Sequence, residues 1–216
     1  METRAPHSAL LWQLSTNELL KRLRNMQCIM TGIIYTHFPK HRGPDANVLQ
    51  IVNAFKENRT EIDSAKFGKS GTNEEKAWFN SDYVLGKVAP GLKKIDGMLV
   101  EEIIDGKKKT VPVPVLYGDN GKIVKSYNPD GWGEKDGILL EVECGMMVIA
   151  NKTHLEDLIK AIQIPGVKHF VIAAARTWDY RGSIKNPFER IVTDFTSFYE
   201  SNRVVLPFET LTIIGF

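Results

Sequence analysis

The chain has 216 residues, of which 43% are hydrophobic and 25% are charged, and its formal net charge is +2. This composition is ordinary for a soluble globular protein, and the length is sufficient for one sizeable core. No apolar run approaches the roughly 18 residues that cross a bilayer, so we expect no membrane-spanning helix. The small net charge does not exclude nucleic-acid binding, because a carboxylate cluster would offset a basic groove in the sum.

Cysteine usage and the first residues bear on the cellular compartment. Only two cysteines occur, Cys28 and Cys144, far apart and without metal-ligand spacing. A reduced, cytoplasmic setting fits this pattern best. The first 30 residues lack the basic start, apolar core and small-residue cleavage site of a signal peptide. We therefore expect a soluble, cytoplasmic protein.

Helical periodicity dominates the first part of the chain. Ser15–Glu18 has the spacing of a capping box, and the apolar residues from Leu19 to Ile34 predict one long amphipathic helix that Pro39 breaks. A second helix is predicted to open at Asp45. Its expected buried stripe is Val48, Leu49, Ile51, Val52 and Phe55.

A polar, glycine-bearing stretch, residues 60–75, predicts a loop. Asn73 is then expected to cap a short helix that runs through Tyr83 and ends before Gly86. From about residue 95 the periodicity becomes strand-like, with strong turn signals at Asp105-Gly106 and at Gly118–Gly121. The predicted strands are Met98–Ile104, Thr110–Leu116, Lys122–Tyr127 and Ile138–Cys144.

Helices and strands then alternate to the end of the chain. Helices are predicted from Thr153 to Ile162 and from Pro187 to about Tyr199, and strands at Lys168–Ala174 and Leu211–Phe216. This order predicts an α/β fold, a single domain with a central mixed β-sheet flanked by helices. We expect residues 1–90 to be its mainly helical N-terminal part and residues 95–216 to be its core.

Three carboxylates gather in the segment from Asp130 to Glu143. Glu141 and Glu143 are two apart in a run of strand-forming aliphatic residues, so their side chains point to the same face. A hairpin return through Gly131–Gly137 would bring Asp130 opposite them. Carboxylates this close repel each other unless a cation lies between them, and a hard divalent ion such as Mg²⁺ takes an all-oxygen site. We interpret the segment as the metal-binding edge of a nuclease.

A solvated strand face with alternating charge would also explain the Glu-Val-Glu pattern. Two observations favour the metal site. Leu139-Leu140 before the acids and Met146–Ala150 after them make the strand central, where acids are costly unless they are ligands. Asp130 also follows a proline at the mouth of the preceding turn, at the offset that meets Glu141 across a hairpin.

The acidic motif resembles the signature of a known superfamily. Pro129-Asp130, ten intervening residues and Glu141-Val142-Glu143 are similar to the PD-(D/E)XK nuclease signature, with Glu143 where a lysine usually stands. An acid-x-acid ending characterises the BamHI-like branch of type II restriction endonucleases, which includes BglII- and BstYI-like enzymes. The resemblance covers roughly residues 110–216, where the later strands and helices follow in the same order and at nearly the same spacing.

The resemblance implies a restriction-endonuclease-like nuclease domain over residues 1–216 that hydrolyses double-stranded DNA with Mg²⁺. Such enzymes usually act as homodimers on palindromic sites, and the resemblance implies a staggered cut with 5′ overhangs. A cognate DNA methyltransferase would act on the same site. Asp130 and Glu141 would be the main metal ligands, and Glu143 would be a ligand or the base that positions water. An acid from an N-terminal helix would complete the site, with Glu57, Glu61, Glu74 and Glu75 as the candidates.

DNA contacts are expected at two places after the acidic strand. The first precedes the next helix, where BamHI-like enzymes approach the major groove, and the second is the loop before the last helix. Both could equally be ordinary solvated loops. The candidate residues are Asn151, Lys152 and Thr153 in the first, and Arg176, Asp179, Arg181 and Lys185 in the second.

Two alternative functions stay open. One is a PD-(D/E)XK nuclease with a task in DNA repair or junction processing, and the other is a non-catalytic DNA-binding module that kept the fold. A DNA methyltransferase gene next door would favour restriction, because a host must shield its own sites.

Overall fold

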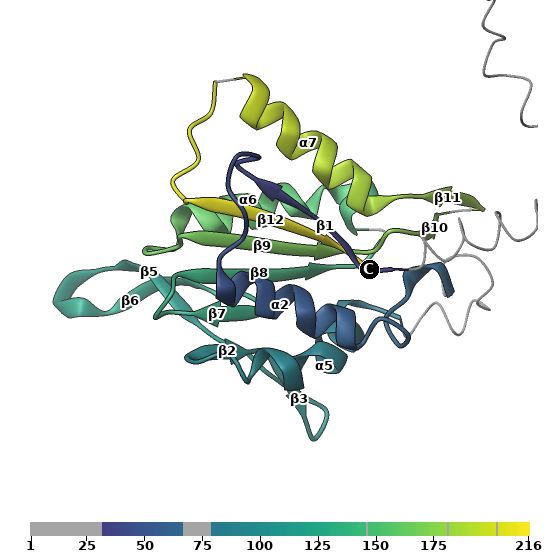
Figure 1. The fold of residues 1–216 in the computed structure, drawn as a ribbon. Coiled ribbons are helices and arrows are strands. Elements are labelled where there is room, and N and C mark those ends of the chain that lie inside the picture. Colours follow the sequence, from purple (N-terminus) through teal and green to yellow (C-terminus); the bar gives the residue numbers. More distant parts are fainter. Residues whose placement is uncertain (1–31, 67–78, 146, 181, 202) are drawn as a thin grey trace, which may run out of the picture. The chain divides into compact units, whose positions relative to one another are not determined.

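The computed structural model describes residues 32–66, 79–145, 147–180, 182–201 and 203–216 (Figure 1). Within it, Ile33–Phe216 form one compact unit. None of the helices in the described part of the chain combines the length and the hydropathy of a membrane span.

A six-stranded mixed sheet forms the centre of this unit. Two neighbouring pairs, β8 with β9 and β9 with β12, are parallel, and the other pairs are antiparallel. This confirms the predicted class, a mixed α/β fold with a mixed central sheet. In spatial order the strands are β1 (Ile34–Phe38), β12 (Thr210–Gly215), β9 (His169–Ala174), β8 (Ile138–Glu143), β7 (Gly131–Gly133) and β2 (Met98–Val100).

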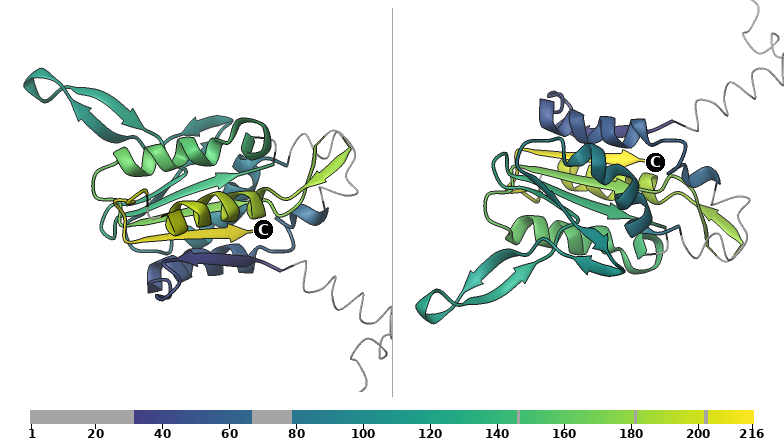
Figure 2. Two further views of the ribbon diagram at one scale, coloured as in Figure 1. Left: turned by 90° about the horizontal axis from the view of Figure 1, so that it is seen from above. Right: turned by 90° about the horizontal axis from the view of Figure 1, so that it is seen from below.

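Helices cover both faces of the sheet (Figure 2). The helices α2 (Ala46–Glu57) and α5 (Ser81–Leu92) pack on the face that carries Leu140 and Val142 of β8. The helices α6 (Thr153–Gln163) and α7 (Pro187–Ser201) pack on the opposite face, with Leu139. Side chains alternate along a strand, so β8 contributes to both cores and is buried on both faces.

Three two-stranded hairpins extend this core. They are β3 (Glu102–Ile104) with β4 (Lys107–Lys109), β5 (Val113–Tyr117) with β6 (Ile123–Tyr127), and β10 (Trp178–Tyr180) with β11 (Ser183–Lys185). Figure 2 shows β5–β6 and β10–β11 projecting at opposite ends of the sheet. A short 3₁₀ turn, Asp119–Gly121, closes β5–β6, and a π-helical turn, Met147–Asn151, follows β8.

The predicted long N-terminal helix is wrong at its end. Ile34–Phe38 is an edge strand, β1, which pairs antiparallel with β12. The β-branched and aromatic residues of this segment suit a strand, and the available edge of β12 decides the outcome. The remainder of that predicted helix lies outside the described residues.

The second helix prediction is confirmed as α2, with Asp45 at its N-cap. Four of the five residues of its predicted stripe are buried, and Leu49 is exposed. The third prediction, a helix from Asn73 that ends before Gly86, starts outside the described residues and is wrong at its end. Helix α5 starts at Ser81, because the Asn80 side chain accepts a hydrogen bond from the Tyr83 amide at 2.9 Å, and it continues past Gly86 to Leu92.

Predictions in the second half of the chain are closer. The strands β8, β9 and β12 and the helices α6 and α7 lie where periodicity places them, within one or two residues at each end. The predicted strand Met98–Ile104 is instead interrupted at Glu101, where β2 leaves the sheet and β3 begins. Four short strands, β4, β7, β10 and β11, were not predicted.

Candidate active site

The β7–β8 pairing places Asp130 next to Glu141. Gly131 pairs with Leu140, so the next pair outward is Asp130 with Glu141, and directly opposed residues share a face of the sheet. Oδ2 of Asp130 accepts a hydrogen bond from the Val142 amide at 2.7 Å. The Asp130 carboxylate is therefore fixed against the strand that carries the two glutamates.

Helix α6 adds a lysine and a fourth acid to this face. The Lys160 ammonium donates to Oδ1 of Asp157 at 2.7 Å and to Oε1 of Glu141 at 3.3 Å. Both acids are almost completely buried, with exposed fractions of 2% for Asp157 and 4% for Glu141. Since α6 connects the parallel strands β8 and β9, its inner face crosses the sheet beside the end of β8, and the two acids meet there.

Glu143 lies at the end of β8 and is half-buried. It is close enough to Asp157 and Thr153 for both to affect its pKa. Neither contact has hydrogen-bond geometry, because among the described residues Oδ2 of Asp157 and Oγ1 of Thr153 are buried without a hydrogen-bond partner. The cluster therefore contains buried oxygen atoms that are open to a further ligand.

Burial and mutual repulsion raise the pKa values of these acids. Burial raises the pKa of Asp130 to about 7 and that of Glu143 to about 8, and the charge of Asp157 adds to both shifts. Burial and the charges of Asp157 and Asp130 raise the pKa of Glu141 well above its usual value. Burial alone would lower the pKa of Lys160, but the charges of Glu141 and Asp157 raise it. The cluster thus favours any cation that enters it.

Glu101 extends the row of acids to a third strand. The β2–β7 register places it beside Asp130, and its amide donates to the Asp130 carbonyl at 2.9 Å. Its side chain is 4% exposed, and its charge contributes to the raised pKa of Asp130. Lys108 of β4 pairs with Oε1 of Glu101 at 2.5 Å and with Oδ1 of Asp82 at 3.2 Å.

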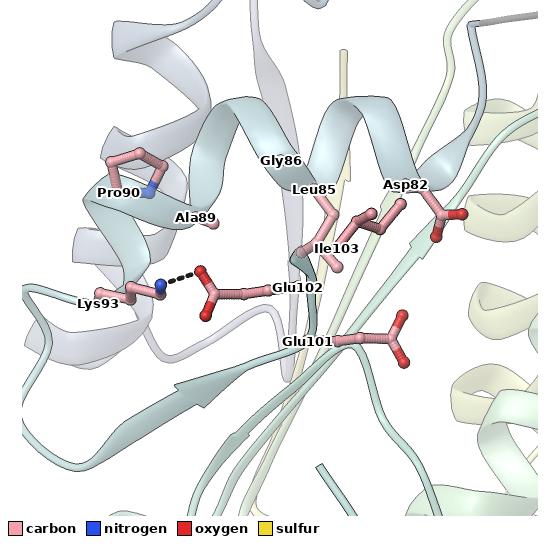
Figure 3. Close-up of a pocket in the computed structure, with 9 residues that line it drawn as sticks. All are labelled: Asp82, Leu85, Gly86, Ala89, Pro90, Lys93, Glu101, Glu102 and Ile103. Carbon is pink, nitrogen blue, oxygen red and sulfur yellow. Dashed lines mark hydrogen bonds and ion pairs between the residues drawn. The ribbon is translucent and has the colours of Figure 1, made fainter. Parts of the chain in front are cut away.

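A cavity of about 350 Å³ separates α5 from β3 and borders this row (Figure 3). Figure 3 shows Asp82 and Glu101 at one end of the cavity and the Lys93–Glu102 ion pair at the other. The apolar wall between them includes Leu85 and Ile103. Of the row of acids, only Glu101 lines this otherwise largely apolar cavity.

Among the residues that the structure describes, no three His, Cys, Asp or Glu side chains already have a geometry that could hold a metal ion. Lys160 instead bonds to both Glu141 and Asp157, and Oδ2 of Asp130 accepts the Val142 amide. The donor set nevertheless fits magnesium in kind, since it consists of oxygens alone. The unpartnered Oδ2 of Asp157 supports the same fit.

The first group of predicted DNA-contacting residues divides in the structure. Asn151 ends the π-helical turn and Lys152 caps α6 with a left-handed backbone, φ 56°, and both are exposed. Thr153 is buried and faces Glu143, so its side chain does not form part of an exposed DNA-contacting surface. Thr153 belongs with the acid cluster, because the first turn of α6 points it at the sheet.

The second predicted group lies around β10–β11. Arg176 is half-buried, and burial lowers its pKa. Oδ1 of Asp179 accepts a hydrogen bond from the Gly182 amide at 2.8 Å and so closes the hairpin turn. Lys185 is half-buried at the end of β11, and Arg181 lies outside the described residues.

The proposed fourth acid is not among the N-terminal candidates that the structure describes. Glu57 and Glu61 are exposed, and Glu61 pairs with Lys87. Glu74 and Glu75 lie outside the described residues. Sequence reasoning missed Glu101, Asp157 and Lys160, although Thr153, Asp157 and Lys160 have the i, i+4, i+7 spacing of one helix face. That line of polar residues on the helix after the acidic strand was the signal that could have identified Asp157 and Lys160 as part of the site.

Comparison with known protein families, with curated proteins and with solved structures finds no match for this chain.

Proposed function

We propose that this chain is a Mg²⁺-dependent endonuclease of the type II restriction kind, which hydrolyses double-stranded DNA at a specific, palindromic site. One observation carries the proposal: Asp130 and Glu141 lie opposite each other on paired strands, in a buried cluster with Glu143 and Asp157. Buried acids in such proximity are costly unless they serve a ligand or a reaction, and strongly shifted carboxyl groups mark functional sites.

The order of the elements supports the same proposal. An antiparallel meander, β2–β7–β8, is followed by the crossover helix α6 and the parallel strand β9. This is the arrangement that the resemblance to PD-(D/E)XK nucleases implies for a restriction-endonuclease-like core. The acids then fall at the end of the central strands, beside the first turns of α6.

Asp130 and Glu141 would hold the metal ion, with Glu143 or Asp157 completing the ligand set. When bound, Mg²⁺ supplies charge to the scissile phosphate and acidifies the attacking water. Burial raises the pKa of Glu143 to about 8 in the metal-free cluster, and a bound cation would favour its carboxylate form, which could then accept a proton from that water. Lys160 supplies the positive charge that position 143 lacks, since its ammonium lies within the cluster.

DNA cleavage by a single site of this kind cuts one strand. A homodimer brings two such sites to the two strands of a palindrome, and this is the expected working form. The cognate methyltransferase would shield the same sequence in the host without binding this chain.

A non-catalytic DNA-binding module is the second candidate, and one observation favours it. Lys160 already neutralises Glu141 and Asp157, as a lysine would in a site that had lost its metal. The two functions differ in whether Mg²⁺ replaces the contacts of that lysine.

Digestion of phage DNA by the purified full-length protein separates these functions. In Mg²⁺, we expect discrete fragments whose sequenced ends share one motif, and no cleavage in EDTA or in Ca²⁺. Glu141→Gln should remove cleavage, whereas the exposed Glu156→Gln on α6 should keep it. Fragments with unrelated ends would indicate another nuclease task. DNA binding without any cleavage would indicate the non-catalytic module and overturn the proposal.

A further inference from the structure

Three consecutive lysines form strand β4, in a hairpin that lies directly beside the acid cluster. The segment Glu102–Lys109, here called the lysine hairpin, pairs β3 with β4 antiparallel. Lys107, Lys108 and Lys109 are all exposed as residues. Successive side chains on a strand point to opposite faces, so Lys107 and Lys109 share one face and Lys108 points to the other.

Lys108 attaches the hairpin to the acid cluster. Its ammonium contacts Oε1 of Glu101 at 2.5 Å and Oδ1 of Asp82 at 3.2 Å. Glu101 is in turn hydrogen-bonded through its backbone to Asp130. One side chain and one backbone hydrogen bond therefore separate β4 from Asp130, which the proposed function makes a metal ligand.

The charges of Lys107 and Lys109 are not neutralised. No ion pair involves Lys107 or Lys109 among the described residues. Glu102, which lies opposite Lys109 in the register, is held by Lys93 of the α5 C-terminus. Asp105 in the hairpin turn is the remaining acid of this segment. The lysine hairpin, which Lys108 attaches to Glu101, thus presents two cations with only one acid in the same segment to offset them.

We propose that Lys107 and Lys109 bind the DNA backbone phosphates next to the scissile phosphate. The inference rests on the proposed function, because it assumes that DNA reaches the acid cluster. A cluster of carboxylates repels a polyanion, so the approach of DNA needs cations at its rim. Lysines serve this purpose as point charges that hold phosphates without reading sequence.

The spacing of residues along β4 separates Lys107 from Lys109. Two residues along a strand are about 6.6 Å apart, so the two ammonium groups occupy separate positions and can contact separate phosphates. The side chains are long and flexible, whereas the hairpin itself is fixed by Lys108. The hairpin therefore sets the place of the contact and the lysine side chains adapt to the DNA.

The salt dependence of DNA binding tests the proposal. Full-length protein is titrated in Ca²⁺, without cleavage, into a fluorescent duplex of about 30 base pairs and arbitrary sequence, between about 50 and 200 mM salt. Each lost phosphate contact lowers the slope of log K against log salt by about 0.9. The double variant Lys107→Gln/Lys109→Gln should therefore lower the slope by about 1.8 and weaken binding at low salt by at least about tenfold.

A matched control comes from a different hairpin, β5–β6. Lys122→Gln/Lys125→Gln removes the same charge from β5–β6, at the opposite end of the sheet from β10–β11, and should keep the wild-type slope (Figure 2). Thermal unfolding of both variants checks their folding. A wild-type slope for the folded Lys107/Lys109 variant overturns the inference while the wild-type protein still binds and cuts DNA. Failure of the wild-type protein to bind DNA would instead overturn the proposed function.

Discussion

The ammonium nitrogen of Lys160 lies 2.7 Å from Oδ1 of Asp157, one helical turn earlier on α6. The same nitrogen also reaches Glu141 across the helix–sheet interface. A lysine in this position is an internal counter-ion. It offsets the charge of the buried acids, so that the protein can fold in the absence of a metal. A divalent ion that enters the cluster must share these carboxylates with Lys160 or displace it.

Removal of this counter-ion should destabilise the metal-free protein. Lys160→Met keeps most of the side-chain volume but leaves two buried carboxylates without their donor, which costs about 1–3 kcal/mol. Urea unfolding in EDTA measures the loss, and Ca²⁺ should restore more stability to the variant than to the wild-type protein. Lys122→Met, at an exposed position on β5–β6, is the control and should change little. Equal stability of the Lys160 variant and the wild type in EDTA would contradict the role given to Lys160.

The metal-free protein should lose stability between about pH 6.5 and pH 8. Burial raises the pKa of Asp130 to about 7 and that of Glu143 to about 8, from usual values of 3.8 and 4.5. Between the usual and the raised pKa the folded state binds more protons than the unfolded state, so the free energy of unfolding falls as the pH rises.

The buried histidines limit the pH range in which the melting temperature reports on the buried acids. Burial lowers the pKa values of His37, His154 and His169 below 6.5, so the stability that they contribute is lost as the pH falls below about 6.5. Above that pH the contribution of the histidines fades, whereas the acids continue to titrate. Melting temperatures in EDTA should fall from pH 6.5 to pH 8, and Asp130→Asn should weaken this trend. A melting temperature that stays constant or rises across the window would rule out the buried acids as its cause.

The sequence predicted the acid pair because a strand period and a hairpin are local features. Alternation alone places Glu141 and Glu143 on one face, and a short return brings Asp130 opposite. Glu101 could not be placed in the same way, since the β2–β7 register depends on a connection of some 30 residues through two other hairpins. The pairing of β1 with β12 could likewise not be predicted, because β12 lies at the other end of the chain.

Asp157 and Lys160 illustrate the intermediate case. The helix that carries them was predicted correctly, but its periodicity does not show whether the polar line faces solvent or the sheet. Only the crossover from β8 to β9 shows that this line faces the sheet. Tertiary packing thus decides which polar residues of a helix are buried.

Loss of either opposed acid should abolish cleavage. Asp130→Ala and Glu141→Ala each remove a proposed metal ligand, and a loss of several kcal/mol of transition-state stabilisation corresponds to about 1000-fold or more in rate. Timed digestion in Mg²⁺ measures the rate, and DNA binding in Ca²⁺ should survive. Glu134→Ala, at an exposed position after β7, should cut normally. Near wild-type cutting by either acid variant would show that the ligands are wrongly assigned.

Gly145 should tolerate no side chain. It has φ 44°, and a Cβ there would overlap the indole of Trp178, which starts β10. Gly145→Ala should cost about 2–4 kcal/mol, from a left-handed backbone together with overpacking. Gly166→Ala is the matched control, because its φ is also positive, 82°, but a Cβ added there would meet no atom within 4 Å. Urea unfolding of the two variants should show the larger loss for Gly145, and equal losses would contradict the packing of Trp178 on this glycine.

Calorimetric titration of EDTA-stripped protein with Ca²⁺ tests most directly whether the acid cluster binds a divalent ion. The wild-type protein should bind the ion, and Asp130→Asn and Glu141→Gln should each weaken the affinity at least about tenfold through the loss of a carboxylate ligand, whereas Glu134→Gln should leave it unchanged. Absence of binding to the wild-type protein, or equal affinity in all four proteins, would contradict a metal site at Asp130 and Glu141.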